Sequence, residues 1–264
     1  MIAIVLPRWD GRLADALLFQ KNRDFRVSVS EITPEVEDYQ NRLSIVQGDL
    51  RQVEEPLTCV LEPGATPDKD FLRRIARTTS RHPDFDVYHV NLPEGKPFPR
   101  KVKIGKLFQY LVVESVPAPL SSFVFRTALL REKAVFTADG AIDPIPTVLV
   151  CSKERPLRNV WRQQLDWQAP LPASDPVSVE KSIRTRLDLF HWSESFFGDE
   201  DYPLSAGERM DLFAGTIVQL FPTYAEDALK EQMASFQVSQ GPIRKLRAAH
   251  ALSSALKERV KQLR

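Results

Sequence analysis

Short apolar runs alternate with amphipathic stretches through the first 92 residues, and this rhythm constrains the fold more than any other feature. The predicted strands are residues 2–6, 25–29, 43–46, 57–61 and 87–92. After the first run, Leu13, Ala16 and Leu17 recur at helical spacing. Residues 2–6 are apolar throughout, which is typical of a strand buried on both faces. Strands that alternate with helices in this way predict a mostly parallel sheet with helices on its faces.

The rest of the chain changes character. Residues 93–120 are rich in proline and glycine, so we expect a long excursion over the surface. Strand character resumes at 121–126 and a helix follows to 132, while 147–151 is another apolar β-branched run. The prolines of 170–176 indicate a linker, and the pattern beyond it is helical. We therefore expect an α/β domain over residues 1–169 and a helical C-terminal region over residues 170–264.

Composition excludes several classes of protein. Lys plus Arg is 36 and Asp plus Glu is 35, a balance that argues against a dedicated nucleic-acid binder. No apolar run reaches the roughly 18 residues that a membrane span needs. The two cysteines, Cys59 and Cys151, cannot build a disulfide framework, so a reducing compartment is expected. These features predict a cytoplasmic or membrane-peripheral globular protein and indicate no chemistry.

One stretch carries a more specific pattern. Residues 61–72, Leu-Glu-Pro-Gly-Ala-Thr-Pro-Asp-Lys-Asp-Phe-Leu, close an apolar strand, turn through Pro-Gly and restart as a helix. This resembles the acidic turn of family 2 glycosyltransferases, in which a strand ends in an Asp-x-Asp turn and a proline opens the next helix. Residues 4–20, residues 81–88 and residues 119–143 are similar to other blocks of the family, in the same order. The resemblance covers about residues 1–155.

The resemblance implies a fold and an activity. The fold would be a three-layer α/β/α sandwich of the nucleotide-diphospho-sugar transferase (GT-A) type, with a mostly parallel sheet and a helical C-terminal extension. Residues 1–169 would bind a nucleotide-diphospho sugar. The favoured activity is transfer of a hexosyl unit to a hydroxyl of a saccharide or lipid-linked glycan, as in polysaccharide biosynthesis. The alternative is a catalytically inactive relative that binds or scaffolds, because a fold does not fix a function.

A divalent cation is the first cofactor that the resemblance implies. In the family, Mn or Mg held by the Asp-x-Asp carboxylates neutralises the diphosphate. The matching positions here are Glu62 and Gly64, so a single carboxylate remains and Glu62 is the expected metal ligand. The alternative for Glu62 is an ordinary glutamate at a solvent-facing strand end.

The nucleotide-sugar site implied by the resemblance takes residues that follow the strands. Its candidate residues are Pro7, Trp9, Asp10, Glu31, Glu62 and Gly64. Trp9 lies where an aromatic ring could stack on a nucleobase, and packing within the fold is the alternative for it. Glu31 follows the second strand, where the family has an acidic residue that reads the base. The family's next nucleotide-binding segment is shortened here to residues 48–54.

Asp143 is the expected catalytic residue. It lies where the family has its general base, which accepts the proton of the attacking acceptor hydroxyl. Pro144 follows it and disfavours the helical conformation at Asp143. An ordinary Asp-Pro turn is therefore the alternative interpretation.

The end of the chain carries a basic amphipathic pattern. Residues 242–263 repeat apolar side chains at alternating spacings of three and four, and residues 241–264 hold seven Lys or Arg against the single acid Glu258. Such a helix can lie on an anionic membrane surface, which would place the protein at the inner face of the membrane. The alternative is that the apolar seam packs on the body or on a second copy, giving a homodimer. Upstream, Ser205 and Glu208 have the spacing of a capping box.

Overall fold

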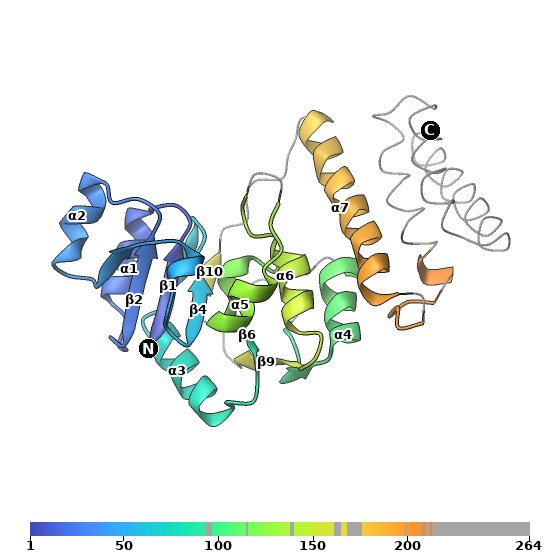
Figure 1. Cartoon of the computed structure of the whole chain (residues 1–264), viewed down its shortest axis with the longest axis horizontal. Coiled ribbons are helices and arrows are strands. Elements are labelled where there is room, and N and C mark those ends of the chain that lie inside the picture. The colour runs from blue at the N-terminus through green and yellow to red at the C-terminus, as the bar shows by residue number, and fades with distance from the viewer. Residues whose placement is uncertain are drawn as a thin grey trace. The chain divides into compact units, whose positions relative to one another are not determined.

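A computed structural model describes residues 1–92, 97–114, 116–137, 140–160, 165–167, 176–198, 200–205, 207–209 and 212 (Figure 1). The chain divides into two compact units, Met1–Pro170 and Leu171–Arg264. The basic helix expected at 242–263 and most of the linker expected at 170–176 lie outside the described residues. Each unit is considered by itself.

An eight-stranded mixed sheet forms the centre of the first unit, with strand order β3-β2-β1-β4-β8-β6-β9-β7 (Figure 1). Its strands are β1 (Ile2–Leu6), β2 (Phe25–Val29), β3 (Ile45–Gln47), β4 (Leu57–Val60), β6 (Val87–Val90), β7 (Lys101–Val102), β8 (Phe123–Arg126) and β9 (Leu157–Val160). β1 pairs in parallel with β2 and β4, β2 with β3, and β6 with β9. β8 is antiparallel to both of its neighbours, β4 and β6. The expectation of a mostly parallel α/β sheet is confirmed, and all five expected strands lie in it.

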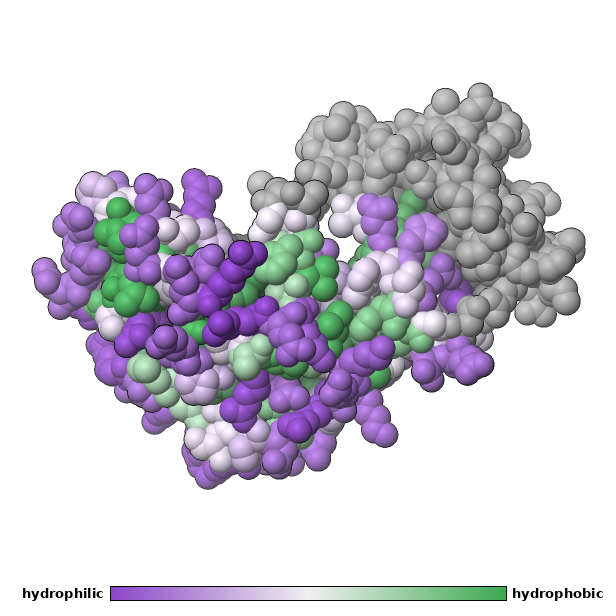
Figure 2. Space-filling view, in the orientation of Figure 1, coloured by the Kyte–Doolittle hydropathy of each residue, from purple (hydrophilic) through white to green (hydrophobic). Residues whose placement is uncertain are grey.

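Helices connect the strands. They are α1 (Gly11–Leu18), α2 (Pro34–Gln40), α3 (Phe71–Arg81), α4 (Ile104–Phe108), α5 (Thr127–Lys133) and α6 (Pro144–Cys151), with the short helical turns η1 (Leu50–Gln52), η2 (Gln109–Val113) and η3 (Leu120–Ser122). A second, two-stranded antiparallel sheet joins β5 (Ala65–Pro67) to β10 (Leu165–Trp167). Figure 2 shows that hydrophobic residues reach the viewed surface only in separate patches among hydrophilic ones.

The sheet buries side chains on both of its faces. Ile4 lies opposite Val27 and Cys59 in the neighbouring strands, and these residues share one hydrophobic core with Leu17 of α1 and Ile75 of α3. Because successive side chains of a strand point to opposite faces, α1 and α3 pack on the Ile4 face. The helical spacing of the apolar residues in α1 and α3 accounts for this packing.

The opposite face is held by polar as well as apolar contacts. Thr58 of β4 shares a buried hydrogen bond of 2.8 Å with Thr127, the first residue of α5. On the same face, the buried His89 ring stacks on Phe98 at 4.2 Å between centroids and contacts Phe123 at 5.0 Å. His89 Nδ1 lies 3.4 Å from Asn159 Oδ1, and burial lowers the pKa of His89 to about 3.

Two expectations about local structure are wrong. Residues 97–114 are not a surface excursion, because Phe98, Leu107 and Phe108 are buried and the segment contains β7 and α4. The β-branched run 147–151 belongs to the helix α6. Pro144 occupies the first turn of α6, where its fixed φ is preorganised for a helix, and this start outweighs the modest β preference of valine and threonine.

In the second unit, α7 (Pro176–Phe197) is the longest described helix. The hydroxyls of Ser193 and Tyr202 lie 2.7 Å apart in a buried hydrogen bond. The expected capping box is confirmed, because the Ser205 N–H donates to Glu208 Oε2 at 2.9 Å and the Glu208 N–H donates to Ser205 Oγ at 3.3 Å. Across the part of the chain that the structure describes, no helix combines the length and the apolar character needed to cross a bilayer.

Candidate functional site

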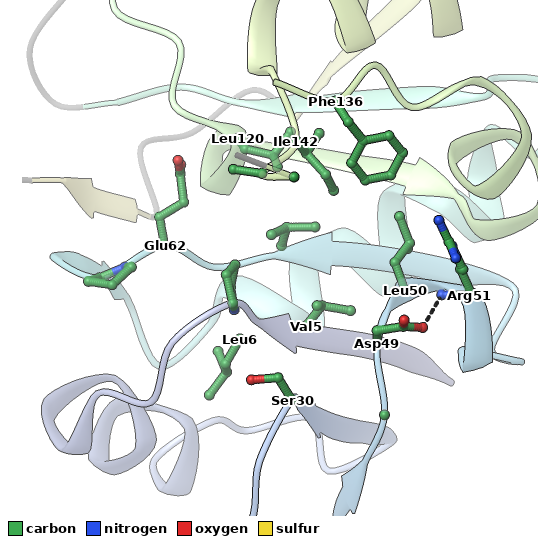
Figure 3. A pocket seen from close by; sticks show the side chains of 16 residues that line it. Val5, Leu6, Ser30, Asp49, Leu50, Arg51, Glu62, Leu120, Phe136 and Ile142 are labelled. Carbon is green, nitrogen blue, oxygen red and sulfur yellow. Dashed lines mark hydrogen bonds between the residues drawn. The ribbon is translucent and has the colours of Figure 1, made fainter. Parts of the chain in front are cut away.

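A cavity of about 770 Å³ opens where β1 to β4 reach their carboxyl ends (Figure 3). The ends of β1, β2 and β4, together with the segment from the end of β3 into η1, contribute Val5, Leu6, Pro7, Ser30, Gly48, Asp49, Leu50, Arg51, Val60, Glu62 and Pro63. Leu120 of η3 and the residues Phe136, Gly140, Ala141 and Ile142 complete the lining. Ligands of open α/β sheets bind outside the carboxyl ends of the strands, and the volume falls within the roughly 300–1,000 Å³ that is usual for ligand sites.

The cavity is mainly apolar, with charge at its two ends. Figure 3 shows Glu62 at one end and Arg51 at the other, and Phe136 lies on the Arg51 side. Phe136 is 49% exposed, which is unusual for a large aromatic residue. Its backbone pairs with Ile142, which places both residues on one wall of the cavity.

A reciprocal set of hydrogen bonds fixes Glu62 against Ser121, which is fully buried. The Glu62 N–H donates to Ser121 Oγ at 2.7 Å. In return, Glu62 Oε2 accepts from the N–H and from the hydroxyl of Ser121, each at 3.2 Å. We call this arrangement the Glu62–Ser121 latch. It joins the end of β4 to the turn that precedes β8, and it holds one half-buried carboxylate at the rim of the cavity.

The turn after Glu62 explains the glycine that follows it. The Ala65 N–H donates to the Glu62 carbonyl at 3.1 Å, Pro63 takes the second position, and Gly64 has a φ of 88°. These are the features of a type II turn, whose third position needs the left-handed conformation that glycine adopts without cost. Position 64 therefore serves the backbone, and it carries no side chain that could reach a ligand.

The described residues do not by themselves supply a divalent-cation site. No group of three or more His, Cys, Asp or Glu side chains among them is close enough to hold a metal ion. The other carboxylate of the cavity lining, Asp49, accepts the Arg51 N–H at 2.8 Å and caps η1. Hard cations such as Mg²⁺ take about six oxygen ligands. Glu62 alone does not fit that requirement, and metal binding at Glu62 stays a prediction.

Two of the expected nucleotide-sugar residues, Pro7 and Glu62, line the cavity. Trp9 and Asp10 are not among the lining residues. The Trp9 ring packs edge-on against Tyr39 with centroids 5.3 Å apart. Asp10 is the N-cap of α1, and its carboxylate accepts the Arg12 N–H at 2.9 Å. Both side chains therefore have structural contacts in this part of the fold.

The other two expected residues flank the lining. Glu31 is exposed and follows Ser30, which lines the cavity. Gly64 follows Pro63, which also lines it. Glu31 and Gly64 lie near the cavity because they follow the ends of β2 and β4, but neither residue lines it.

Asp143 directly follows the lining residue Ile142. It is the N-cap residue of α6, with an extended backbone, and its N–H donates to the Val135 carbonyl at 2.8 Å. The side chain is half-buried, and burial raises the pKa of Asp143 above that of an ordinary aspartate. A raised pKa suits a group that must accept a proton near neutral pH.

Arg51 and Phe136 are lining residues that the sequence did not single out as site residues. Arg51 lies in the shortened segment after the third strand. The available sign of it was a basic residue in the short segment that connects the third strand to the fourth. Phe136 falls within the 119–143 block of the family resemblance, and it approaches the cavity from a hairpin far along the chain.

Comparison with known proteins gives a likeness of fold. No protein-family model matches this chain, and no curated protein matches it. Among solved structures, the crystal structure of S. aureus TarS 1-349 is similar, with a TM-score of 0.51 and 15% sequence identity. The match covers 99% of this chain and 82% of the TarS chain. At this identity the likeness shows the fold alone.

Proposed function

We propose that this protein transfers a hexosyl unit from a nucleotide-diphospho sugar to a hydroxyl of a saccharide or lipid-linked glycan. TarS is a glycosyltransferase, so the likeness supports a glycosyltransferase-like fold. The observation that carries the proposal is the cavity at the carboxyl ends of β1 to β4, with a fixed carboxylate at its rim. The proposed architecture is the three-layer α/β/α type, and the packing of α1 and α3 on one face and α5 on the other supports it.

The proposed reaction needs three contributions from the chain. The cavity binds the donor, and its apolar walls exclude water from the anomeric carbon. Asp143 accepts the proton of the acceptor hydroxyl as the hydroxyl oxygen attacks that carbon. A new carbon–oxygen bond forms, the bond from the anomeric carbon to the diphosphate breaks, and the nucleoside diphosphate leaves with the electron pair.

Nucleotide binding tests the proposal directly. Isothermal titration with uridine and guanosine diphosphates, and with their hexose conjugates, should show saturable binding at micromolar to millimolar concentration. Release of nucleoside diphosphate in the presence of a glycan acceptor should then report turnover. If no nucleotide diphosphate binds at millimolar concentration, with or without Mn or Mg, the transferase proposal is refuted.

A second candidate is a catalytically inactive relative that binds nucleotide sugars or glycans. The observation in its favour is the Glu62–Ser121 latch, which already occupies one oxygen of the carboxylate that remains at the acidic turn. Binding of nucleotide sugars without release of nucleoside diphosphate, over a panel of acceptors, would support this candidate over the transferase.

Partners beyond the substrates are part of the proposal. The basic segment 242–263 would contact either the inner face of a membrane or a second copy of the chain. Co-sedimentation with anionic vesicles that disappears at high salt would support the membrane contact. A concentration-dependent dimer in analytical ultracentrifugation would support the second copy.

A further inference from the structure

Among the described residues that line the cavity, Arg51 is the one basic side chain. Within the described part of the chain, Arg51 has no ion pair, and its side chain is exposed. The nearest acid in sequence, Asp49, directs its carboxylate to a backbone N–H. An arginine remains charged at every physiological pH, and its planar fork matches two oxygens of a phosphate. Arg51 is therefore a permanent cation in the cavity lining, and among the described residues no carboxylate forms an ion pair with it.

The backbone around Arg51 is held firmly in place. η1 begins with a capping box in which Asp49 accepts the Arg51 N–H and the Asp49 N–H donates to Gln52 Oε1 at 3.2 Å. Ser28 Oγ donates to the Gly48 carbonyl at 2.8 Å. A β-carbon at position 48 would lie 2.6 Å from Gln52 Oε1, so a larger residue there would displace the Gln52 side chain from the capping box. These contacts fix the position of Arg51 before any ligand arrives, which lowers the entropic cost of binding.

Among the described residues, the Glu62 end of the cavity lacks the several oxygen ligands that a divalent cation would need. Glu62 holds the one carboxylate of the acidic turn, with Oε2 engaged by Ser121, and Gly64 offers no side-chain ligand atom. A diphosphate inside an apolar cavity still requires positive charge, because burying an uncompensated anion is strongly unfavourable. In this lining, Arg51 supplies that charge, and Figure 3 shows it beside the exposed ring of Phe136.

We infer that the cavity binds the diphosphate of its ligand through the Arg51 guanidinium, without a divalent cation. The inference rests on the proposed function and assigns how that site recognises its anion. The diphosphate lies at the Arg51–Phe136 end. The Glu62 carboxylate, at the other end, accepts hydrogen bonds from hydroxyl groups and does not coordinate a metal.

Titration of uridine diphosphate and inorganic pyrophosphate into the full chain, in EDTA and then with Mn, tests the inference. The affinity in EDTA should match the affinity with Mn within about twofold. Arg51→Gln should weaken binding about 10–100-fold, the usual value of a hydrogen bond to a charged group. Arg51→Lys keeps the charge and loses the fork, so its loss should be smaller. Arg23→Gln, which removes an exposed arginine outside the cavity, is the matched control and should bind within twofold of the unmodified chain.

The outcomes separate the inference from the proposed function. Binding that needs Mn, or that survives Arg51→Gln unchanged, overturns the inference and leaves the transferase proposal standing. Absence of all nucleotide binding removes both. A folding defect cannot imitate the expected result, because the cap of η1 uses the backbone N–H of Arg51, which every substitution retains. An unchanged near-ultraviolet circular dichroism spectrum confirms this for each variant.

Discussion

Replacing Ser121 by alanine tests whether the Glu62–Ser121 latch stabilises the end of β4. Ser121→Ala removes the hydroxyl that accepts the Glu62 N–H and donates to Glu62 Oε2. The backbone bond from the Ser121 N–H to Glu62 Oε2 remains. The substitution thus removes two of the three hydrogen bonds of the latch and leaves the Glu62 N–H without its acceptor.

The size of the effect follows from these bonds. A neutral hydrogen bond contributes about 0.5–1.5 kcal/mol net and one to a charged group about 1.5–3 kcal/mol. The two lost bonds share one hydroxyl and are not additive, and water can reach the half-buried Glu62. We expect a loss of about 2–3 kcal/mol in the free energy of unfolding. For a chain of this length, that loss lowers Tm by roughly 5–10 °C.

Differential scanning calorimetry measures this change, and a second serine provides the control. Ser30 lines the same cavity, is exposed, and has no recorded side-chain hydrogen bond within the described residues. Ser30→Ala should change stability by less than about 0.5 kcal/mol. If Ser121→Ala melts at the same temperature as Ser30→Ala, the latch does not stabilise the fold and the reasoning is refuted.

Substitutions at three further positions probe the turn, the general base and the core. Gly64→Ala should lower the free energy of unfolding by about 1–2 kcal/mol, because a φ of 88° is unfavourable for a residue with a side chain. Gly64→Asn should lower it less, because asparagine tolerates this conformation better. Equal melting temperatures of the two variants would contradict the type II turn. Asp143→Asn should leave Tm unchanged or raise it at pH 7, because burial disfavours the charged carboxylate. The same substitution should lower turnover about 10²–10⁴-fold. Unchanged turnover in an active enzyme would exclude Asp143 as the base. Below pH 6.5 the unfolded chain protonates His89 and the folded chain does not until about pH 3, so stability should fall as pH falls. His89→Leu should reduce that slope by about 1.4 kcal/mol per pH unit in urea unfolding, and an unchanged slope would contradict the buried neutral histidine.

The parallel half of the sheet could be predicted because its strands are buried on both faces. β1 and β2 have the predicted bounds. β1 is apolar at every position, as expected of a strand covered on both faces, and β2 alternates Phe25, Val27 and Val29 with Arg26 and Ser28. The helices α1 and α3 were also found, because each presents one apolar stripe to the core. α6 was not recognised as a helix from its composition. There the proline start and the tertiary packing outweigh the preference of its β-branched residues.

The candidate site was predictable only where it follows a strand end. Glu62 and Pro7 lie at such ends and line the cavity. Phe136 and Leu120 reach the same cavity from segments far along the chain, and their positions depend on where β8 inserts. Sequence periodicity reports local structure, so it cannot assemble a wall from distant segments. Trp9 shows the converse, because a suggestive residue near a strand end packs against Tyr39.

The place of β8 in the sheet has a consequence for how the protein is made. Among the described strands, β8 alone joins the β3-β2-β1-β4 block to the β6-β9-β7 block, and it follows β4, β6 and β7 in the chain. During synthesis β4 therefore presents an unpaired edge until residue 126 has left the ribosome. Exposed edges of this kind recruit other chains, so nascent protein stalled before β8 would be prone to aggregation. Phe136 and Ile142, which complete the cavity wall, are thus synthesised only after β8, when the exposed edge of β4 can be covered.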